Sequence, residues 1–82
     1  MDLLKGLVDD KLLRILILFI NNPDELYHIN KVAKNANVPL TTTFRLIKDL
    51  LDNNIIEAIK ISKFKVYKLS KNQKTKSLKK LI

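Results

Sequence analysis

Residues 29–54 read INKVAKNANVPLTTTFRLIKDLLDNN, and this stretch decides the fold. Apolar residues recur at helical spacing on both sides of a break at residues 37–39. The break is Asn-Val-Pro; Asn tolerates the left-handed conformation that ends a helix, and Pro is favoured where a helix begins. The stretch therefore predicts two helices, over residues 30–36 and 40–53, joined by a tight turn.

The two helices have distinct predicted faces. Asn30 is expected to cap the first, Ala33 to allow a close helix crossing, and Val38 to fill the core from the turn. In the second helix, Thr43 and Leu46 lead the face that is predicted to be buried, with Ile47 and Leu50 following at the same spacing. Its other face carries hydroxyl, aromatic and basic residues first and two acidic residues last: Thr41, Thr42, Phe44, Arg45, Lys48, Asp49 and Asp52.

The segment before this unit predicts one more helix, over residues 9–22, with Asp9 as its N-cap. This helix is apolar almost all round, whereas a surface helix of a small domain needs only one apolar stripe. Either the domain wraps it or a second subunit covers it, and we favour the second interpretation, a dimer helix. Residues 26–29 are expected to form a very short strand.

The segment after this unit predicts a β-hairpin over residues 55–69, because apolar and basic residues partly alternate there. Ser62 and Lys63 would form its tip. Ser70 would cap a final helix over residues 71–82, in which Leu78 heads an apolar stripe shared with Leu81 and Ile82. The alternative for this last segment is a frayed basic tail.

Charge is distributed unevenly along the 82 residues, whose net charge is +8. Residues 1–29 hold three basic and five acidic residues, a net of −2, and residues 30–82 hold thirteen basic and three acidic residues, a net of +10. Nine lysines and no acid lie between Lys60 and Lys80. A field of one sign on one part of a domain favours a polyanionic partner over a surface that serves only solubility.

Composition also excludes several classes of protein. The chain has no Cys, one His and one Gly, which excludes disulfides, thiolate or multi-histidine metal sites and a Gly-rich phosphate loop. We therefore predict no enzyme activity, no cofactor and no metal. No apolar run approaches the ~20 residues that span a bilayer, and the N-terminus lacks the pattern of a signal peptide. A cytoplasmic, nucleoid-associated location without membrane contact is expected.

These motifs resemble the winged helix-turn-helix domains of transcription regulators, including the broad MarR, ArsR and archaeal DNA-binding groups. The likeness rests on the residues that match the capped helix, the turn and the hydroxyl-led second helix: Asn30, Ala33, Asn37, Val38, Thr41, Thr42 and Asn54-Ile55-Ile56. Asn37 and Asn54 stand where Gly is common, and Pro39 stands where Ser or Thr often caps the recognition helix. The resemblance implies that the second helix, over residues 40–53, is the recognition helix and enters the DNA major groove. It also implies that the hairpin over residues 55–69 is the wing.

Candidate DNA contacts follow from that placement. On the recognition helix they are the hydroxyl, aromatic and basic residues Thr41, Thr42, Phe44, Arg45 and Lys48. Phe44 could meet the groove or, equally, the wing or a second subunit. Contacts with the DNA phosphate backbone are expected from Lys31 and Lys34 on the preceding helix and from Lys60, Lys63, Lys65 and Lys68 on the wing. For each single lysine, simple solvation is the competing interpretation.

We therefore predict an α+β, mainly α fold: one winged helix-turn-helix domain over residues 1–82, with a three-helix core and a two-stranded β-wing. The predicted function is sequence-specific binding of double-stranded DNA by a transcription regulator, as a homodimer through the first helix and the C-terminal segment. The alternatives are a winged-helix protein-interaction module of transcription or replication machinery and a non-specific nucleoid protein. The Lys, Asn and Ile bias predicts an AT-rich genome and, together with the resemblance, an archaeal or viral source.

Overall fold

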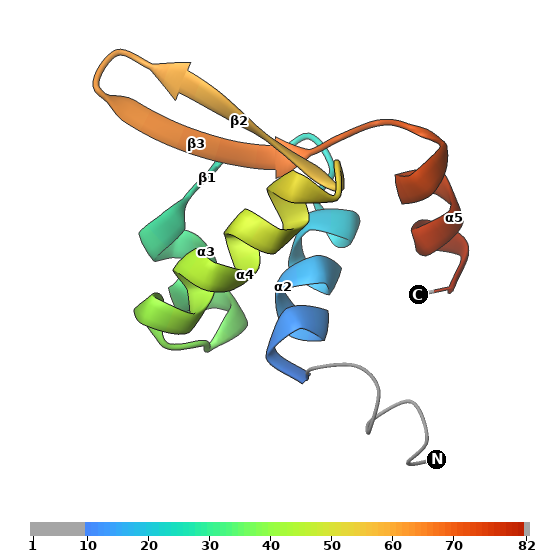
Figure 1. The fold of residues 1–82 in the computed structure, drawn as a ribbon, viewed down its shortest axis with the longest axis horizontal. Coiled ribbons are helices and arrows are strands. Elements are labelled where there is room, and N and C mark those ends of the chain that lie inside the picture. The colour runs from blue at the N-terminus through green and yellow to red at the C-terminus, as the bar shows by residue number, and fades with distance from the viewer. Residues whose placement is uncertain (1–9, 82) are drawn as a thin grey trace.

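The computed structural model describes residues 10–81, which form four helices and a three-stranded antiparallel sheet (Figure 1). In chain order the elements are α2 (Asp10–Asn21), β1 (Tyr27–His28), α3 (Ile29–Ala36), α4 (Leu40–Asp52), β2 (Ile56–Ile61), β3 (Phe64–Leu69) and α5 (Gln73–Leu81). The predicted fold class is confirmed, and the short strand β1 adds a third strand to the sheet. The predicted cap Asp9 and the stripe residue Ile82 lie outside the described residues.

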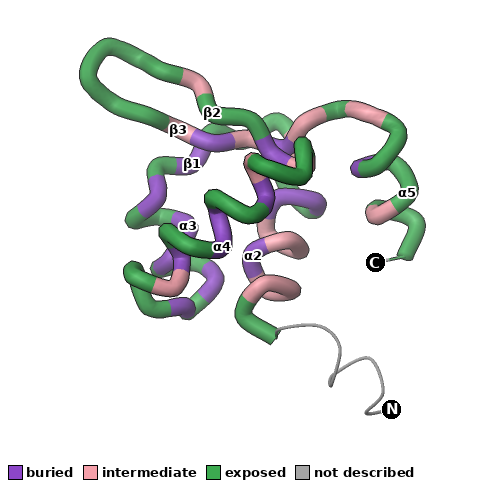
Figure 2. The backbone as a smooth tube through the Cα atoms, viewed as in Figure 1, coloured by how far each residue is buried: buried purple, intermediate pink, exposed green. Residues whose placement is uncertain are grey.

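The core lies where α2, α3 and α4 meet the root of the sheet (Figure 2). Phe19 and Ile15 of α2 and Val32 of α3 have no exposed surface. The four residues predicted for the inner face of α4 are all buried: Thr43, Leu46, Ile47 and Leu50. Burial of these side chains, rather than helix propensity, accounts for most of the stability of such short helices.

Only part of the apolar surface of α2 is buried within this domain. Three of its residues are buried, Ile15, Phe19 and Ile20, and Leu12, Leu16 and Leu18 pack against the core while keeping some exposure. Leu13 and Ile17 are half-buried and do not belong to the core cluster. The domain therefore wraps α2 on one side and leaves part of its apolar surface accessible.

The sheet has the order β1-β3-β2, with β3 in the centre. At its root Tyr27 pairs with Tyr67, and Ile56 pairs with Leu69, and all four side chains are buried. Beyond this root β2 and β3 continue as a hairpin that projects from the helices in Figure 1. Its two-residue tip is Ser62 and Lys63, as predicted, and Ser62 adopts a φ of 56°.

Two predicted helix caps are wrong. α3 begins at Ile29, and its N-cap is His28, whose Nδ1 accepts a hydrogen bond from the backbone N–H of Asn30 at 3.3 Å. The sequence reasoning missed this because imidazole is an uncommon N-cap acceptor compared with Asn.

At α5 the cap is Asn72 and not Ser70. Its Oδ1 accepts from the N–H of Thr75 at 2.9 Å, and its own N–H donates to Thr75 Oγ1 at 3.1 Å, a reciprocal capping arrangement. The last segment is thus a helix rather than a frayed tail over its described residues. Leu78 packs against the core, but the side chain of Leu81 is 82% exposed, so the predicted apolar stripe is buried only in part.

The candidate nucleic-acid interface

The turn between α3 and α4 is built by local hydrogen bonds. Asn37 adopts the left-handed conformation, with φ 55° and ψ 52°, as predicted from its position after the helix. The N–H of Asn37 donates to Lys34 O at 3.2 Å, and the N–H of Val38 donates to Ala33 O at 2.9 Å. Val38 is buried, so the turn is anchored in the core and fixes the angle between the two helices.

The first turn of α4 has no side-chain cap, because Pro39 stands at the N-cap position. Thr43 stabilises this turn from inside: its N–H and its Oγ1 both donate to Pro39 O, each at 2.9 Å. The Thr43 side chain is fully buried. Since no side chain caps the amino end of α4, its first N–H groups keep their capacity to donate to an anion.

The outward face of α4 presents the residues that the sequence singled out. Thr41, Phe44, Arg45 and Lys48 are exposed, and Thr42 is half-buried. At 3.6 residues per turn, Thr41, Arg45 and Lys48 lie opposite the buried Leu46 and Leu50. Thr42 stands toward one edge of this face, so its side chain is less accessible than predicted.

Phe44 is 55% exposed on the other flank of this face. The two ring contacts formed within residues 10–81 join Phe19 to Tyr27 and His28 to Phe64, so the Phe44 ring is not stacked on another aromatic ring of the described chain. An aromatic side chain so placed is available to a groove or to another protein.

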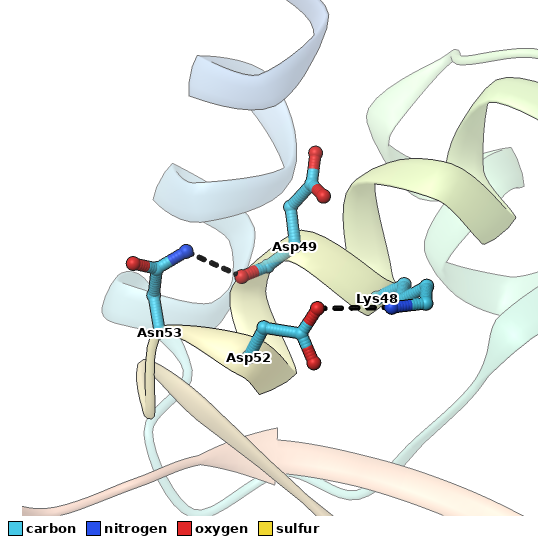
Figure 3. Close-up of polar contacts among 4 residues, drawn as sticks. All are labelled: Lys48, Asp49, Asp52 and Asn53. Carbon is cyan, nitrogen blue, oxygen red and sulfur yellow. Dashed lines mark hydrogen bonds and ion pairs between the residues drawn. The ribbon is translucent and has the colours of Figure 1, made fainter.

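Lys48 is held by an acid one turn further along α4. Its Nζ lies 3.0 Å from Asp52 Oδ2 (Figure 3). The hydrogen bond and the charge of Asp52 raise the pKa of Lys48 above its ordinary value. The sequence predicts a DNA contact for Lys48. The i, i+4 spacing of Lys48 and Asp52 also permits their ion pair, which was not predicted.

The C-terminal end of the same helix is closed by Asn53, whose Nδ2 donates to Asp49 O at 2.8 Å. Asp49 and Asp52 are both exposed, and Figure 3 shows them near this end of α4. Because acids repel phosphate, the amino-terminal half of α4 is the part suited to face a polyanion.

The wing separates two kinds of side chain by strand alternation. Lys60 and Lys65 are direct cross-strand partners and share the face on which Ala58 and Tyr67 pair. Both lysines are exposed, and Lys63 is exposed at the tip. Lysines directly opposite each other repel, so a negatively charged partner would relieve that repulsion on this face of the wing.

Lys68 does not belong to this group. It pairs with Glu57 across the strands and is half-buried near the root of the sheet. The charge of Lys68 also contributes to lowering the pKa of Asp24, after the larger effect of Lys71. The register thus places Lys68 opposite Glu57 and away from the tip, which was not predicted from the sequence.

The lysines of α3 are both exposed. Lys31 Nζ lies 5.9 Å from the centre of the Tyr27 ring, a cation–π distance. Lys34 lines an open depression of about 630 Å³ at the turn, together with Asn30, Asn37 and Leu40. Leu40, the first residue of α4, is 43% exposed, a feature that sequence reasoning missed.

The part of the chain that the structure describes holds no cluster of His, Cys, Asp and Glu that could bind a metal ion. Within the same residues no helix is both long and apolar enough to cross a membrane.

Comparison with known proteins places this geometry in a family. The family profile of the IclR helix-turn-helix domain matches residues 10–58. No curated protein matches the chain. Among solved structures, a ferric uptake regulator from Francisella tularensis has a TM-score of 0.70 at 22% identity, covering 80% of this chain and 55% of its own.

Two further neighbours cover more of their own length. The homodimeric winged helix-turn-helix DNA-binding domain of a possible ArsR-family regulator from Mycobacterium bovis has a TM-score of 0.70 at 21% identity, covering 94% of this chain and 68% of its own. A protein of Archaeoglobus fulgidus has a TM-score of 0.74 at 20% identity, covering 94% and 85%. The resemblance to winged helix-turn-helix regulators is confirmed, and at these identities the structural likeness establishes the fold. This chain spans about half the length of the ferric uptake regulator.

Proposed function

Because the chain belongs to the IclR helix-turn-helix domain family, one of DNA-binding transcription regulators, we propose that it binds double-stranded DNA sequence-specifically. α4 lies in the major groove, and the basic wing holds the flanking backbone. The observation that carries this proposal is the outward face of α4, where Thr41, Arg45 and Lys48 stand opposite the buried core residues. We place the protein in the cytoplasm, at the nucleoid.

The proposed contacts divide into two roles. Arg45 and Thr41 contact base edges, Arg45 through the bidentate geometry that guanine accepts, and Phe44 packs against sugar or a thymine methyl. Thr42 and the lysines contact the DNA phosphate backbone, and these lysines are Lys31, Lys34, Lys48, Lys60, Lys63, Lys65 and Lys68. Lys68 contributes least to DNA affinity, because it lies near Glu57.

A homodimer is the proposed assembly. Leu13 and Ile17 of α2 keep accessible apolar surface, and Leu81 of α5 is 82% exposed. A second copy packed on α2 and α5 would cover these side chains and present two recognition helices to half-sites about 34 Å apart. Sedimentation of the wild type and of Leu81→Asp tests this: a dimer weakened by the substitution supports the interface, and a wild-type monomer at micromolar concentration contradicts it.

The exposure of Phe44 and of the apolar part of α2 favours one competing function, a winged-helix protein-interaction module. In that case the lysines would serve only solubility. Titration with random duplex at low salt separates the two functions, because a solubilising surface does not give binding with a steep salt dependence.

The experiment for the proposed function is a titration of random duplex and of the DNA upstream of the coding sequence, at two salt concentrations. A preference of about 10³-fold or more for the upstream site, with steep salt dependence, is the result expected of an autoregulating specific binder. Salt-dependent binding without any preference, there or among selected random sequences, indicates a nucleoid protein. Absence of binding at both salt concentrations rejects the DNA-binding function.

Residue roles are tested with matched charge losses. Arg45→Ala should lower affinity for the specific site more than for random duplex, because it removes a base contact. Lys63→Ala should lower both equally, because it removes a phosphate contact. Lys79→Ala is the control: it removes the same charge from the exposed surface of α5, which lies at the opposite end of the molecule from the wing tip in Figure 1. An equal effect of all three variants would contradict the assignment.

A further inference from the structure

The tip of the wing carries two large apolar side chains that no core contact explains. Ile61 and Phe64 are direct cross-strand partners and form the last pair before the two-residue turn. They are 48% and 62% exposed. Figure 2 shows the whole tip as exposed chain that projects beyond the helices. Two large apolar side chains that lie side by side and exposed at the end of a projecting hairpin indicate an interaction site and not a surface that meets only water.

The alternation of the strands assigns this pair to one face of the wing. Ile59, Ile61, Phe64 and Val66 share the face opposite to that of Lys60 and Lys65. The Phe64 ring meets the His28 ring edge-on, with 6.3 Å between ring centres, so β1 supports it from the root side. A partly supported ring loses less conformational freedom on binding than a free one.

The surroundings of the pair decide the chemistry of its partner. Lys60, Lys63 and Lys65 all lie within one residue of Ile61 or Phe64 along the chain, and residues 58–68 contain no acid. Lys63 lies in the turn, and Lys60 and Lys65 lie on the face opposite to Ile61 and Phe64, so a partner that surrounds the tip meets apolar side chains on one face and ammonium groups on the other. Burying those ammonium groups against apolar surface would leave them unpaired, which is costly. A partner that offers apolar surface between rows of anions satisfies both sets of side chains, and the minor groove of a DNA duplex is such a surface.

We propose that Ile61 and Phe64 form an apolar wedge that enters the minor groove beside the major-groove site of α4. The wedge packs against sugars and base edges, while Lys60, Lys63 and Lys65 hold the phosphates of the groove walls. Proteins that bind the minor groove use apolar side chains in this way, at the cost of widening the groove or unstacking a base step. This inference rests on the proposed function, because it presumes that the protein binds duplex DNA.

The first test compares the wedge with its lysines. Phe64→Ala and Ile61→Ala should each weaken DNA binding about five- to tenfold, as loss of a partly buried apolar contact implies, and leave the salt dependence unchanged. Lys63→Ala should instead reduce the slope of log K against log salt by about 0.9. Leu26→Ala is the matched control, since it truncates an apolar side chain that is 43% exposed in the loop before β1 and should leave binding within about twofold.

The second test identifies the groove. Replacing G·C by I·C pairs in the DNA flanks removes the amino group from the minor groove and leaves the major-groove pattern of acceptors and donors in place. The wild type should bind such DNA more tightly than the G·C duplex, and Phe64→Ala should lose most of this gain.

The outcomes separate this inference from the proposed function. If the wild type binds no duplex, the proposed function is wrong and the wedge with it. If the wild type binds and Lys63→Ala weakens it, but Phe64→Ala and Ile61→Ala bind as the wild type does, the wing acts by charge alone and only the wedge is wrong. An equal gain on I·C DNA for wild type and Phe64→Ala also contradicts the wedge. Circular dichroism confirms that each variant remains folded.

Discussion

Asp52→Asn should increase the affinity of this protein for DNA. Asp52 accepts from Lys48 Nζ at 3.0 Å on the outward face of α4, and both side chains are largely exposed, at 61% and 76%. The pair therefore occupies a lysine that would otherwise be available to a phosphate, and adds a negative charge beside it. Asn keeps the shape of the side chain and removes the charge.

The size of the effect follows from counterion release. If Lys48 becomes free to neutralise one phosphate, the slope of log K against log salt steepens by about 0.9. An additional slope of that size is equivalent to about an eightfold gain in affinity at 0.1 M salt, relative to 1 M salt where the gain disappears. Stability should change little, because an exposed i, i+4 ion pair contributes little and an acid near a helix C-terminus opposes the helix dipole.

The assay is a fluorescence anisotropy titration at several salt concentrations, with Asp24→Asn as the matched control. Asp24 forms a comparable exposed ion pair, 2.7 Å from Lys71 Nζ, but it lies in the loop before β1 and not on α4. Both variants raise the net charge by one, so a purely long-range effect would be equal in the two. Equal gains, or no gain for Asp52→Asn, would refute the placement of α4 against DNA.

Three further predictions concern the scaffold. Thr43→Val should lower the melting temperature by about 4–8 °C, because it removes a hydroxyl that donates to Pro39 O at 2.9 Å and is worth about 1 kcal/mol; unchanged thermal unfolding would contradict a role for this bond. Asn37→Ala should be about 1 kcal/mol less stable than Asn37→Gly in urea unfolding, since φ is 55° there and Cβ disfavours that conformation; equal stability would contradict it. NMR titration should show that Lys71→Ala raises the pKa of Asp24, which the hydrogen bond and charge of Lys71 hold below its usual value. Since that pKa is depressed in the folded state, the pair contributes stability above about pH 4, and the contribution is lost as the pH falls through the folded-state pKa; an Asp24 titration unaffected by the substitution would show that the pair does not form in solution.

Much of this architecture was predictable because local rules and tertiary packing agree. The turn at Asn37 and Val38 and the buried face of α4 follow from residue types whose conformational preferences match what the fold requires. The caps were predicted less well. His28 and Asn72 serve where Asn30 and Ser70 were expected, because a cap depends on the backbone conformation at one residue, which neighbouring elements decide.

The candidate interface shows the same division. The sequence identified the exposed and basic residues of α4 but not that Lys48 is paired with Asp52, nor that Lys68 lies beside Glu57. The apolar tip pair was also missed. Alternation within each strand could show that Ile61 and Phe64 avoid the lysine face, but only the register makes them partners.

The sequence by itself determined the helix-turn-helix, the hairpin and the positive charge of the C-terminal part, because helical and strand periodicity and composition are properties of the chain. Tertiary structure alone decided which of those charges are free to act. Cross-strand register sets Lys60 against Lys65 and Lys68 against Glu57. Tertiary packing also decided that α2 is covered on one side only. These are relations between segments distant in sequence, and their distances and exposure exist only once the segments have packed.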